Sequence, residues 1–287
     1  MSQTDLPYQN ILVIAANGKT GRRVVPLLEE RGVNVRRGSR SSSPAFDWAG
    51  RDTWPEAMRG MDAVYVVYQP DLAVPQAPDD IRALVEVAKQ QGVRKLVLLS
   101  GRGVKEAKAA ERIVADSGLD WTFVRAAWFN QNLSEGDFAH MTQTGVIALP
   151  MGDAVEPIID VDDIAEVVVA ALTDTRHNGE AYDLSGPEAL THDQIAEELS
   201  RAAGREVRYQ PISLDEFRDY LGAAQVPGDY IDLLAYLFEV TVSGVNAQPT
   251  GDVERVLGRP AKSFREFAAR AAEEGLLLPA AEEVPGG

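Results

Sequence analysis

The sequence predicts an α/β fold: a Rossmann-type parallel sheet with helices on both faces, followed by a smaller, mostly helical C-terminal lobe. Two observations carry this prediction. Short apolar runs alternate with amphipathic stretches through roughly the first 170 residues, and a glycine-containing turn follows the first apolar run. Strands that are apolar along their whole length are typical of a parallel sheet buried on both faces.

The expected elements follow one another in regular order. Strands are expected at residues 10–15, 33–37, 62–68, 95–100 and 121–126. Helices are expected at residues 20–31, 78–91 and 104–117, where apolar positions recur on one face. After residue 130 the pattern is less regular, with a short strand at 146–149 and a helix at 162–172 that returns to the main sheet.

Later helices are marked by their amino-terminal residues. A hydroxyl residue followed three positions later by Glu or Gln forms a capping box, which satisfies two backbone N–H groups at a helix start. The C-terminal part contains three such pairs: Thr191 with Gln194, Ser213 with Glu216, and Ser263 with Glu266. We expect these helices mostly in the C-terminal lobe.

Composition narrows the classes of function. The formal net charge is −16, which disfavours binding to nucleic acid phosphates and to an acidic membrane surface. The chain has no cysteine, which excludes disulfides, thiolate nucleophiles and Cys-ligated metal sites. No signal peptide or apolar run of membrane-spanning length is visible. We therefore expect a cytoplasmic protein with no nucleic acid or membrane partner.

A candidate nucleotide-binding loop lies between the first strand and the first helix. Residues 15–21 read AANGKTG, which is the spacing GxxGxxG with its first glycine replaced by Ala15. Gly18 would let the backbone approach a pyrophosphate, and Gly21 would let the helix pack closely on the strand. The Ala15 methyl would crowd the turn. A tight strand-to-helix turn without a ligand is the alternative, but the following β-α units favour nucleotide binding.

The end of the second strand indicates which nucleotide is bound. Enzymes that use NAD usually carry an acidic residue there, whereas this chain reads RRGSR from 36 to 40 and has no acid before Asp47. Arg40 and Ser39 suit a 2′-phosphate, because a guanidinium group binds phosphate through two hydrogen bonds. Arg36 or Arg37 are alternatives for the main contact, as is Arg22, and a solvated basic loop is the non-functional alternative. NADP(H) is the predicted cofactor.

Several segments resemble one family, the NmrA-like proteins among the atypical short-chain dehydrogenases. They are residues 17–25 (NGKTGRRVV), 93–101 (VRKLVLLSG), 110–133, 157–172, 182–209 and 252–269. The resemblance covers nearly the whole chain. It implies a Rossmann fold and an activity found among its members, which include quinone and azo reductases, iminium reductases and non-catalytic redox-sensing regulators.

The resemblance also implies roles for particular residues. It places Asn17, Gly18, Lys19, Thr20 and Gly21 in the loop on the pyrophosphate, Ser39 and Arg40 on the 2′-phosphate, and Asp47 and Trp48 beside the adenine. After the fourth strand of the family pattern, Tyr68, Gln69 and Pro70 would lie on the nicotinamide side, Tyr68 also lining the substrate pocket. Ser100 would end the fifth strand near the nicotinamide ribose. Trp128, Phe129 and Asn130 would follow the sixth strand and shape the substrate pocket, with core packing the alternative for the two aromatic residues.

Domain organisation follows from these assignments. We expect residues 1–287 to form one NmrA-like unit, with 1–135 mainly binding the nucleotide. Residues 136–278 are expected to form mainly the substrate lobe, apart from the returning helix at 162–172, and 279–287 a flexible tail. Asp160, Asp162 and Asp163 precede a helix, where capping and the helix dipole account for acidic residues, so no metal site is predicted.

One expected catalytic pair is missing from the sequence. Short-chain dehydrogenases commonly use Tyr-x-x-x-Lys, but no tyrosine lies between Tyr68 and Tyr182, and alignment on Glu111 puts Gly103 and Ala107 at the two positions. The sequence therefore lacks the usual residues that donate a proton to the carbonyl oxygen of a substrate. We hypothesise an NADPH-dependent reductase of a small molecule, such as a quinone, iminium ion or activated alkene, acting as a monomer or homodimer. A non-catalytic NADP(H)-sensing regulator is the alternative, and a nucleotide-sugar epimerase is a third.

Overall fold

The computed structural model describes residues 6–136 and 138–278, and these form two compact units. The first unit contains the chain up to Ala127, Val161–Ser185 and Thr250–Pro260. The second contains Trp128–Asp160, Gly186–Pro249 and the chain from Ala261. The chain thus crosses to the second unit earlier than residue 135, and more than the helix at 162–172 returns to the first. The expected tail at 279–287 lies outside the described residues.

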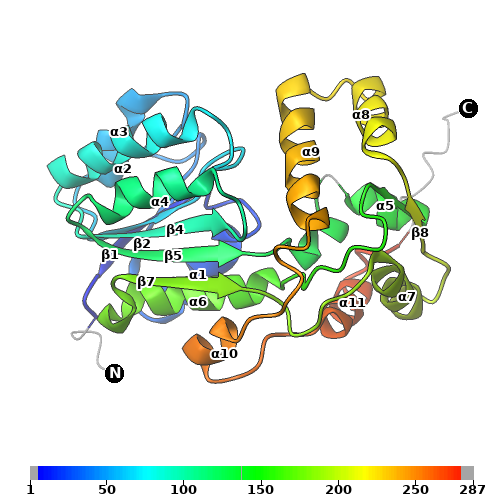
Figure 1. Cartoon of the computed structure of the whole chain (residues 1–287). Helices are drawn as coiled ribbons and strands as arrows, with labels where there is room; N and C mark the ends of the chain where they lie inside the picture. Colours follow the sequence, from blue (N-terminus) through cyan, green and yellow to red (C-terminus); the bar gives the residue numbers. More distant parts are fainter. Residues whose placement is uncertain (1–5, 137, 279–287) are drawn as a thin grey trace, which may run out of the picture. The chain divides into compact units, whose positions relative to one another are not determined.

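A six-stranded parallel sheet forms the centre of the first unit (Figure 1). Its strands are β1 (Asn10–Ile14), β2 (Asn34–Gly38), β3 (Ala63–Val66), β4 (Lys95–Gly101), β5 (Asp120–Ala126) and β7 (Glu180–Leu184). The spatial order is β2-β1-β3-β4-β5-β7, so the direction of winding reverses between β1 and β3. In open parallel sheets, ligands bind outside the carboxyl ends of the strands at such a reversal.

Helices cover both faces of this sheet, as the sequence predicts. In Figure 1, α2 (Trp54–Met58), α3 (Ala77–Gln90) and α4 (Ala107–Ala115) lie on one face. On the other face lie α1 (Gly21–Glu30) and α6 (Val161–Thr173). A short helix, α10 (Asp252–Leu257), packs on α6 and β7. Residues of β1, β3 and β4 are almost completely buried, which explains their continuous apolar sequence.

Three expectations about these elements are corrected. The strands numbered fourth, fifth and sixth in the sequence analysis are β3, β4 and β5, because the chain from Ser39 to Asp62 forms loops, a 3₁₀ turn (Arg51–Thr53) and α2. The strand expected at 62–68 ends at Val66, shortly before Pro70, which has no N–H for a ladder. The helix expected from residue 104 starts at Ala107, because Gly103 has a φ of 74°.

The second unit is mostly helical and contains a two-stranded parallel sheet of β6 (Val146–Leu149) and β8 (Arg208–Pro211). Its helices are α5 (Ala139–Thr144), α7 (His192–Ala203), α8 (Leu214–Ala223), α9 (Gly228–Val242) and α11 (Phe264–Glu273), with a 3₁₀ turn at Asn130–Leu133. All three predicted capping boxes are present, at the starts of α7, α8 and α11. The prediction of these helix starts is confirmed.

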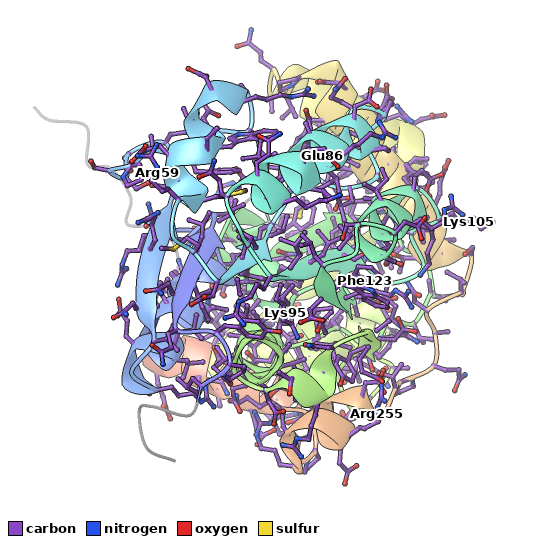
Figure 2. All side chains as sticks on the ribbon, turned by 90° about the vertical axis from the view of Figure 1, so that its left-hand side faces the viewer. Arg59, Glu86, Lys95, Lys105, Phe123 and Arg255 are labelled. Atoms are coloured by element: carbon purple, nitrogen blue, oxygen red, sulfur yellow. The ribbon has the colours of Figure 1, made fainter. Side chains whose placement is uncertain are left out.

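The amino ends of the strands, opposite the candidate ligand edge, enclose a lysine. Figure 2 looks onto this end and shows Lys95 in its middle, whereas Arg59, Glu86 and Lys105 lie on the periphery. Lys95 is fully buried, donates to the side-chain oxygen of Asn178, and lies over the ring of Tyr8. Burial lowers the pKa of Lys95 to about 8.

Within the described residues, no helix combines the length and apolar composition needed to cross a bilayer.

Candidate functional site

The turn between β1 and α1 is built around two close backbone approaches. A Cβ atom on Gly21 would lie 2.2 Å from the carbonyl oxygen of Ala15 and 2.8 Å from the Cα of Ala16. Only glycine therefore lets α1 begin this close to the strand, and the predicted role of Gly21 in helix packing is confirmed. A Cβ on Gly18 would lie 3.2 Å from the same oxygen, which accepts a hydrogen bond from the Gly18 N–H at 2.8 Å.

Ala15 occupies the position of the first motif glycine in a conformation that suits glycine better. Its φ is +54°, in the left-handed region where a Cβ is unfavourable. Ala15 therefore carries backbone strain. Within the loop, Asn17 is exposed, Gly18 and Lys19 are half-buried, and Thr20 is buried. Arg23 fixes the loop from α1, since it donates to the Lys19 carbonyl and pairs with Asp162 of α6.

The basic cluster after β2 separates into bound and unbound arginines. The Arg36 guanidinium donates to the carbonyl oxygens of Ala57 at 3.0 Å and Arg59 at 2.8 Å, at the end of α2. Arg37 pairs with Glu29 at 3.1 Å. Arg40 is exposed and makes no hydrogen bond or ion pair with the described chain. Of the three arginines of this segment, Arg40 alone keeps its guanidinium available for a ligand.

An aromatic cluster lies beyond β2 and β3. Trp48 packs edge-on against Tyr68 with ring centroids 4.7 Å apart, and its indole N–H donates to the Val67 carbonyl. Asp47 precedes it, and its carboxylate accepts from the Ala49 N–H at 3.1 Å. Gln69 and Pro70, which come next after Tyr68, are exposed. The structure thus brings Tyr68 together with the residues expected beside the adenine.

The hydroxyl of Tyr68 is engaged by a residue that the sequence analysis missed. It donates to Asp80 of α3 at 2.7 Å, and Arg51 donates to the same carboxylate at 2.5 Å. Burial and the neighbouring Asp80 raise the pKa of Tyr68. Tyr68 does not line the apolar pocket of the second unit described below, and its hydroxyl holds the aromatic cluster onto α3. The spacing of Tyr68 and Asp80 in the sequence does not indicate this contact, which is visible only in the folded structure.

A second missed network lies at the end of β4. The Ser100 hydroxyl donates to Glu111 at 2.8 Å, Arg125 donates to both carboxylate oxygens, and Lys108 lies 3.1 Å away. Burial alone would raise the pKa of Glu111, but the hydrogen bonds from Arg125 and Ser100 lower it. Lys108, one residue from the expected position of a catalytic lysine, is therefore held in an ion pair. Ser100 is buried and fixed in orientation.

The second unit contains an apolar pocket. Trp128 and Phe129, the two aromatic residues assigned to the substrate pocket from the sequence, line it together with residues that the sequence did not single out. The pocket is completed mainly by these side chains: Asn132, Leu133, Phe138, Leu149, Met151, Glu156, Ile158, His192, Ile195 and Phe238. They come from residues 128–158, from α7 and from α9, so no contiguous motif marks them.

Trp128 is fixed in this pocket by two contacts. Its ring stacks on Phe238 of α9 with centroids 5.0 Å apart, and its indole N–H donates to the Thr241 hydroxyl at 2.8 Å. Trp128 thus packs in the core of the second unit and also lines this pocket, while its role in a substrate site stays a prediction. Asn130, by contrast, does not line the pocket. It is fully buried, its N–H donates to the Ile159 carbonyl, and its amide side chain has no hydrogen-bond partner among the described residues.

Comparison with known proteins assigns the family. Residues 15–175 match the model of a family described as NAD(P)H-binding. The chain belongs to this family. The resemblance to the NmrA-like atypical short-chain dehydrogenases is confirmed.

Two relatives and one solved structure match over most of the chain. It is 35% identical over 283 residues to a (4-alkanoyl-5-oxo-2,5-dihydrofuran-3-yl)methyl phosphate reductase of Streptomyces griseus, covering 92% of this chain and 98% of the relative. It is 33% identical over 282 residues to an NAD(P)H azoreductase of Xenophilus azovorans, covering 90% and 96%. The fold matches the triphenylmethane reductase of Citrobacter sp. complexed with NADP(H), with a TM-score of 0.73, 19% identity, and 91% and 99% coverage.

The first unit of this NAD(P)H-binding protein fits the cofactor of its family. The turn at Gly18 and Gly21 holds the backbone close to Ala15, and the N-terminus of α1 follows directly. Backbone N–H groups at a helix N-terminus bind phosphate groups. The exposed guanidinium of Arg40 provides a positive charge at the end of β2. The residues present thus suit the pyrophosphate of an NAD(P)H cofactor.

The acidic residues around the start of α6 are engaged by arginines. Asp160 pairs with Arg270 and accepts from the Gln131 amide at 2.9 Å. Asp163 pairs with Arg259 at 2.8 Å. Within residues 6–136 and 138–278, no group of three or more His, Asp or Glu side chains is arranged to hold a metal ion. These carboxylates therefore serve as ion-pair partners in the structure.

Proposed function

We propose that this NAD(P)H-dependent reductase uses NADPH to reduce a small, flat, electron-poor molecule such as a quinone, an iminium ion or an activated alkene. The proposal assigns the nucleotide to the turn after β1 and to Arg40, and the acceptor to the apolar pocket of the second unit. The observation that carries it is this pocket, whose aromatic wall of Trp128, Phe138 and Phe238 suits a planar ring.

The chemistry of such acceptors fits the residues of the chain. NADPH supplies the hydride when it is bound. An iminium ion becomes a neutral amine on taking hydride and needs no proton, whereas a reduced quinone takes its proton from solvent. Neither reaction depends on a Tyr-Lys pair, whose positions hold Gly103 and Ala107, and Tyr68 and Lys108 are engaged by carboxylates. The protein then contributes by positioning, which alone supplies several kcal/mol in favourable cases.

The two relatives support an acceptor of this kind. One is an azoreductase, and the other reduces a dihydrofuran that carries oxo and alkanoyl groups. The preference for NADPH over NADH rests on Arg40 and on the lack of an acidic residue from 36 to 46. A charge-assisted hydrogen bond to a phosphate is worth roughly 1.5 to 3 kcal/mol, or about tenfold or more in affinity.

The loss of NADPH absorbance with purified protein tests the proposal. One panel contains quinones, cyclic iminium ions and ring alkenes conjugated to a carbonyl, and the other contains secondary alcohols with NADP⁺ and simple ketones with NADPH. We expect turnover in the first panel and little in the second. Robust oxidation of alcohols would show that another residue replaces the missing tyrosine. Tight NADPH binding without turnover of any acceptor would favour the nucleotide-sensing regulator.

A further inference from the structure

A groove open to solvent adjoins the apolar pocket of the second unit. Met151 and Phe238 line both cavities, so the groove and the pocket share part of a wall. The groove is completed by residues that follow β6, that surround the start of α8 and that end α9: Pro150, Gly152, Asp153, Ala154, Ile212, Leu214, Glu239, Val242 and Ser243. A ring bound in the pocket would therefore lie next to the groove.

The apolar part of the groove is only partly covered by the protein. Met151 and Phe238 are buried, whereas Ile212 and Leu214 are half-buried and Val242 is 50% exposed. Removing apolar surface of this kind from water is favourable. The groove therefore suits an apolar segment of a ligand.

The charged side chains that line the groove are acidic. Asp153 and Glu239 are both exposed, and no lysine, arginine or histidine lines the groove among the described residues. Glu239 lies in the last turn of α9, which contains no basic residue. The carboxyl end of a helix carries a partial negative charge that stabilises a nearby cation. The two carboxylates and the end of α9 thus favour a positively charged group in the groove.

We propose that this groove binds a cationic substituent of the acceptor, so that the protein favours flat acceptors with an ammonium group on a short apolar arm. This inference rests on the proposed function and narrows its substrate class. The arm passes beside Met151, whose unbranched side chain adapts its shape, and it covers the apolar part of the groove. The ammonium group pairs with the carboxylates of Asp153 and Glu239. An arm that ends in a carboxylate meets like charges and is disfavoured.

Two quinones of the same shape and different charge test this selection. One is 1,4-naphthoquinone with a 3-(trimethylammonio)propyl arm at carbon 6, and the other carries the neutral 4,4-dimethylpentyl arm at the same carbon. We would measure kcat/KM for each at saturating NADPH and take the ratio of the cationic to the neutral compound. Asp153→Asn and Glu239→Gln should each lower this ratio by about threefold, and the double variant by about tenfold, as expected for exposed ion pairs.

Two further variants show whether the effect belongs to the groove. Glu197 is an exposed carboxylate of α7 that does not line the groove, so Glu197→Gln removes the same charge and should leave the ratio unchanged. Val242→Lys places a cation at the exposed edge of the groove and should lower the ratio. Comparing ratios cancels the difference in intrinsic reactivity of the two quinones. An equal fall of the ratio in Glu197→Gln would show that only the net charge of the protein matters, which overturns the inference.

Binding without turnover separates this inference from the proposed function. With NADP⁺ present, which delivers no hydride, calorimetry gives the dissociation constants of the two quinones. The double variant should bind the cationic quinone about tenfold more weakly and the neutral quinone equally well. Absence of turnover combined with this loss contradicts the proposed function but supports the inference. Turnover of both quinones with the same ratio in the double variant as in the unmodified protein overturns the inference and leaves the proposed function intact. Failure of the cationic quinone to bind also overturns the inference.

Discussion

The nucleotide edge of the first unit and the pocket of the second unit differ in how their polar groups are satisfied. In the first unit, Tyr68, Ser100 and Arg36 are engaged by neighbouring residues, and Arg40 is left exposed. In the second unit, the His192 imidazole is enclosed by apolar side chains with its Nδ1 unpaired in the described chain.

This difference indicates two modes of recognition. The nucleotide edge of the first unit presents backbone N–H groups at a helix start and the exposed guanidinium of Arg40, which suit a charged ligand. The second unit presents aromatic surface with few polar groups, which suits the shape of a flat ligand. In the first unit, recognition of a charged ligand depends on local backbone geometry at the turn. In the second unit, recognition of ligand shape depends on packing between segments that are far apart in the sequence. The predictions below test whether the two modes are separable.

The largest effect on stability is expected from a substitution in the turn between β1 and α1 of the first unit. Gly21→Ala places a Cβ against backbone atoms of Ala15 and Ala16 that lack room to move, so we expect a loss of about 3 kcal/mol or more in the free energy of unfolding. Urea denaturation measures it. Gly18→Val provides the contrast, because Gly18 has more space and should permit folding while blocking the nucleotide.

The outcome for these two glycines separates packing from ligand binding. If Gly21→Ala is as stable as the unmodified protein, the close approach of α1 to the strand is not essential. If Gly18→Val folds and binds NADPH normally, the nucleotide does not occupy this turn.

Acid should destabilise the second unit through His192. Its pKa is about 4 in the folded protein against about 6.5 in an unfolded chain, so the unfolded state binds more protons between these values. Stability is therefore fully present above pH 6.5 and is lost as the pH falls toward 4, by up to about 3 kcal/mol at 1.36 kcal/mol per pKa unit. His192→Phe should lose less stability over this range. Parallel urea titrations of the two proteins at pH 7, 6, 5 and 4 measure the difference, and parallel pH profiles would show that the ring is not buried as described.

A small increase in the free energy of unfolding is expected when the backbone strain at Ala15, in the nucleotide turn, is removed. Left-handed φ at Ala15 costs roughly 1 to 2 kcal/mol, and glycine brings an entropic cost of about 0.5 to 1 kcal/mol, so Ala15→Gly should stabilise the protein by about 0.5 to 1 kcal/mol. The neighbouring buried Ala16 is the matched control, since its φ is not positive and Ala16→Gly should destabilise. Thermal unfolding of both variants gives the comparison, and equal losses in the two would show that Ala15 is unstrained.

The sequence predicted the nucleotide edge better than the pocket for a physical reason. The need for glycine at position 21 arises within six residues of chain, and the helix-capping pairs are equally local. The pocket instead combines Trp128 with Phe238, which are far apart in sequence and meet only through packing. The role given to Tyr68 was incomplete because its partner, Asp80, lies on α3, and a strand pattern does not show which helix packs above it.

The left-handed conformation of Ala15 was similarly hidden, since a substitution in a glycine motif does not show whether the backbone changes path or the residue accepts strain. The parallel sheet and the helices on both of its faces were predictable, because burial on both faces requires continuous apolar strands. What remained out of reach were contacts made by single polar side chains across elements, such as Glu111 with Arg125.

The separation of nucleotide and acceptor recognition is tested most directly by measuring two quantities side by side in Arg40→Ala and Trp128→Ala. They are the dissociation constant of NADPH by calorimetry and kcat/KM for a quinone at saturating NADPH. Arg40→Ala should weaken NADPH binding by about tenfold or more and leave NADH binding unchanged. Trp128→Ala should lower kcat/KM and leave the NADPH dissociation constant unchanged, as expected if the two sites act separately. Equal affinity of the unmodified protein for NADPH and NADH, or full quinone turnover in Trp128→Ala, would contradict this account.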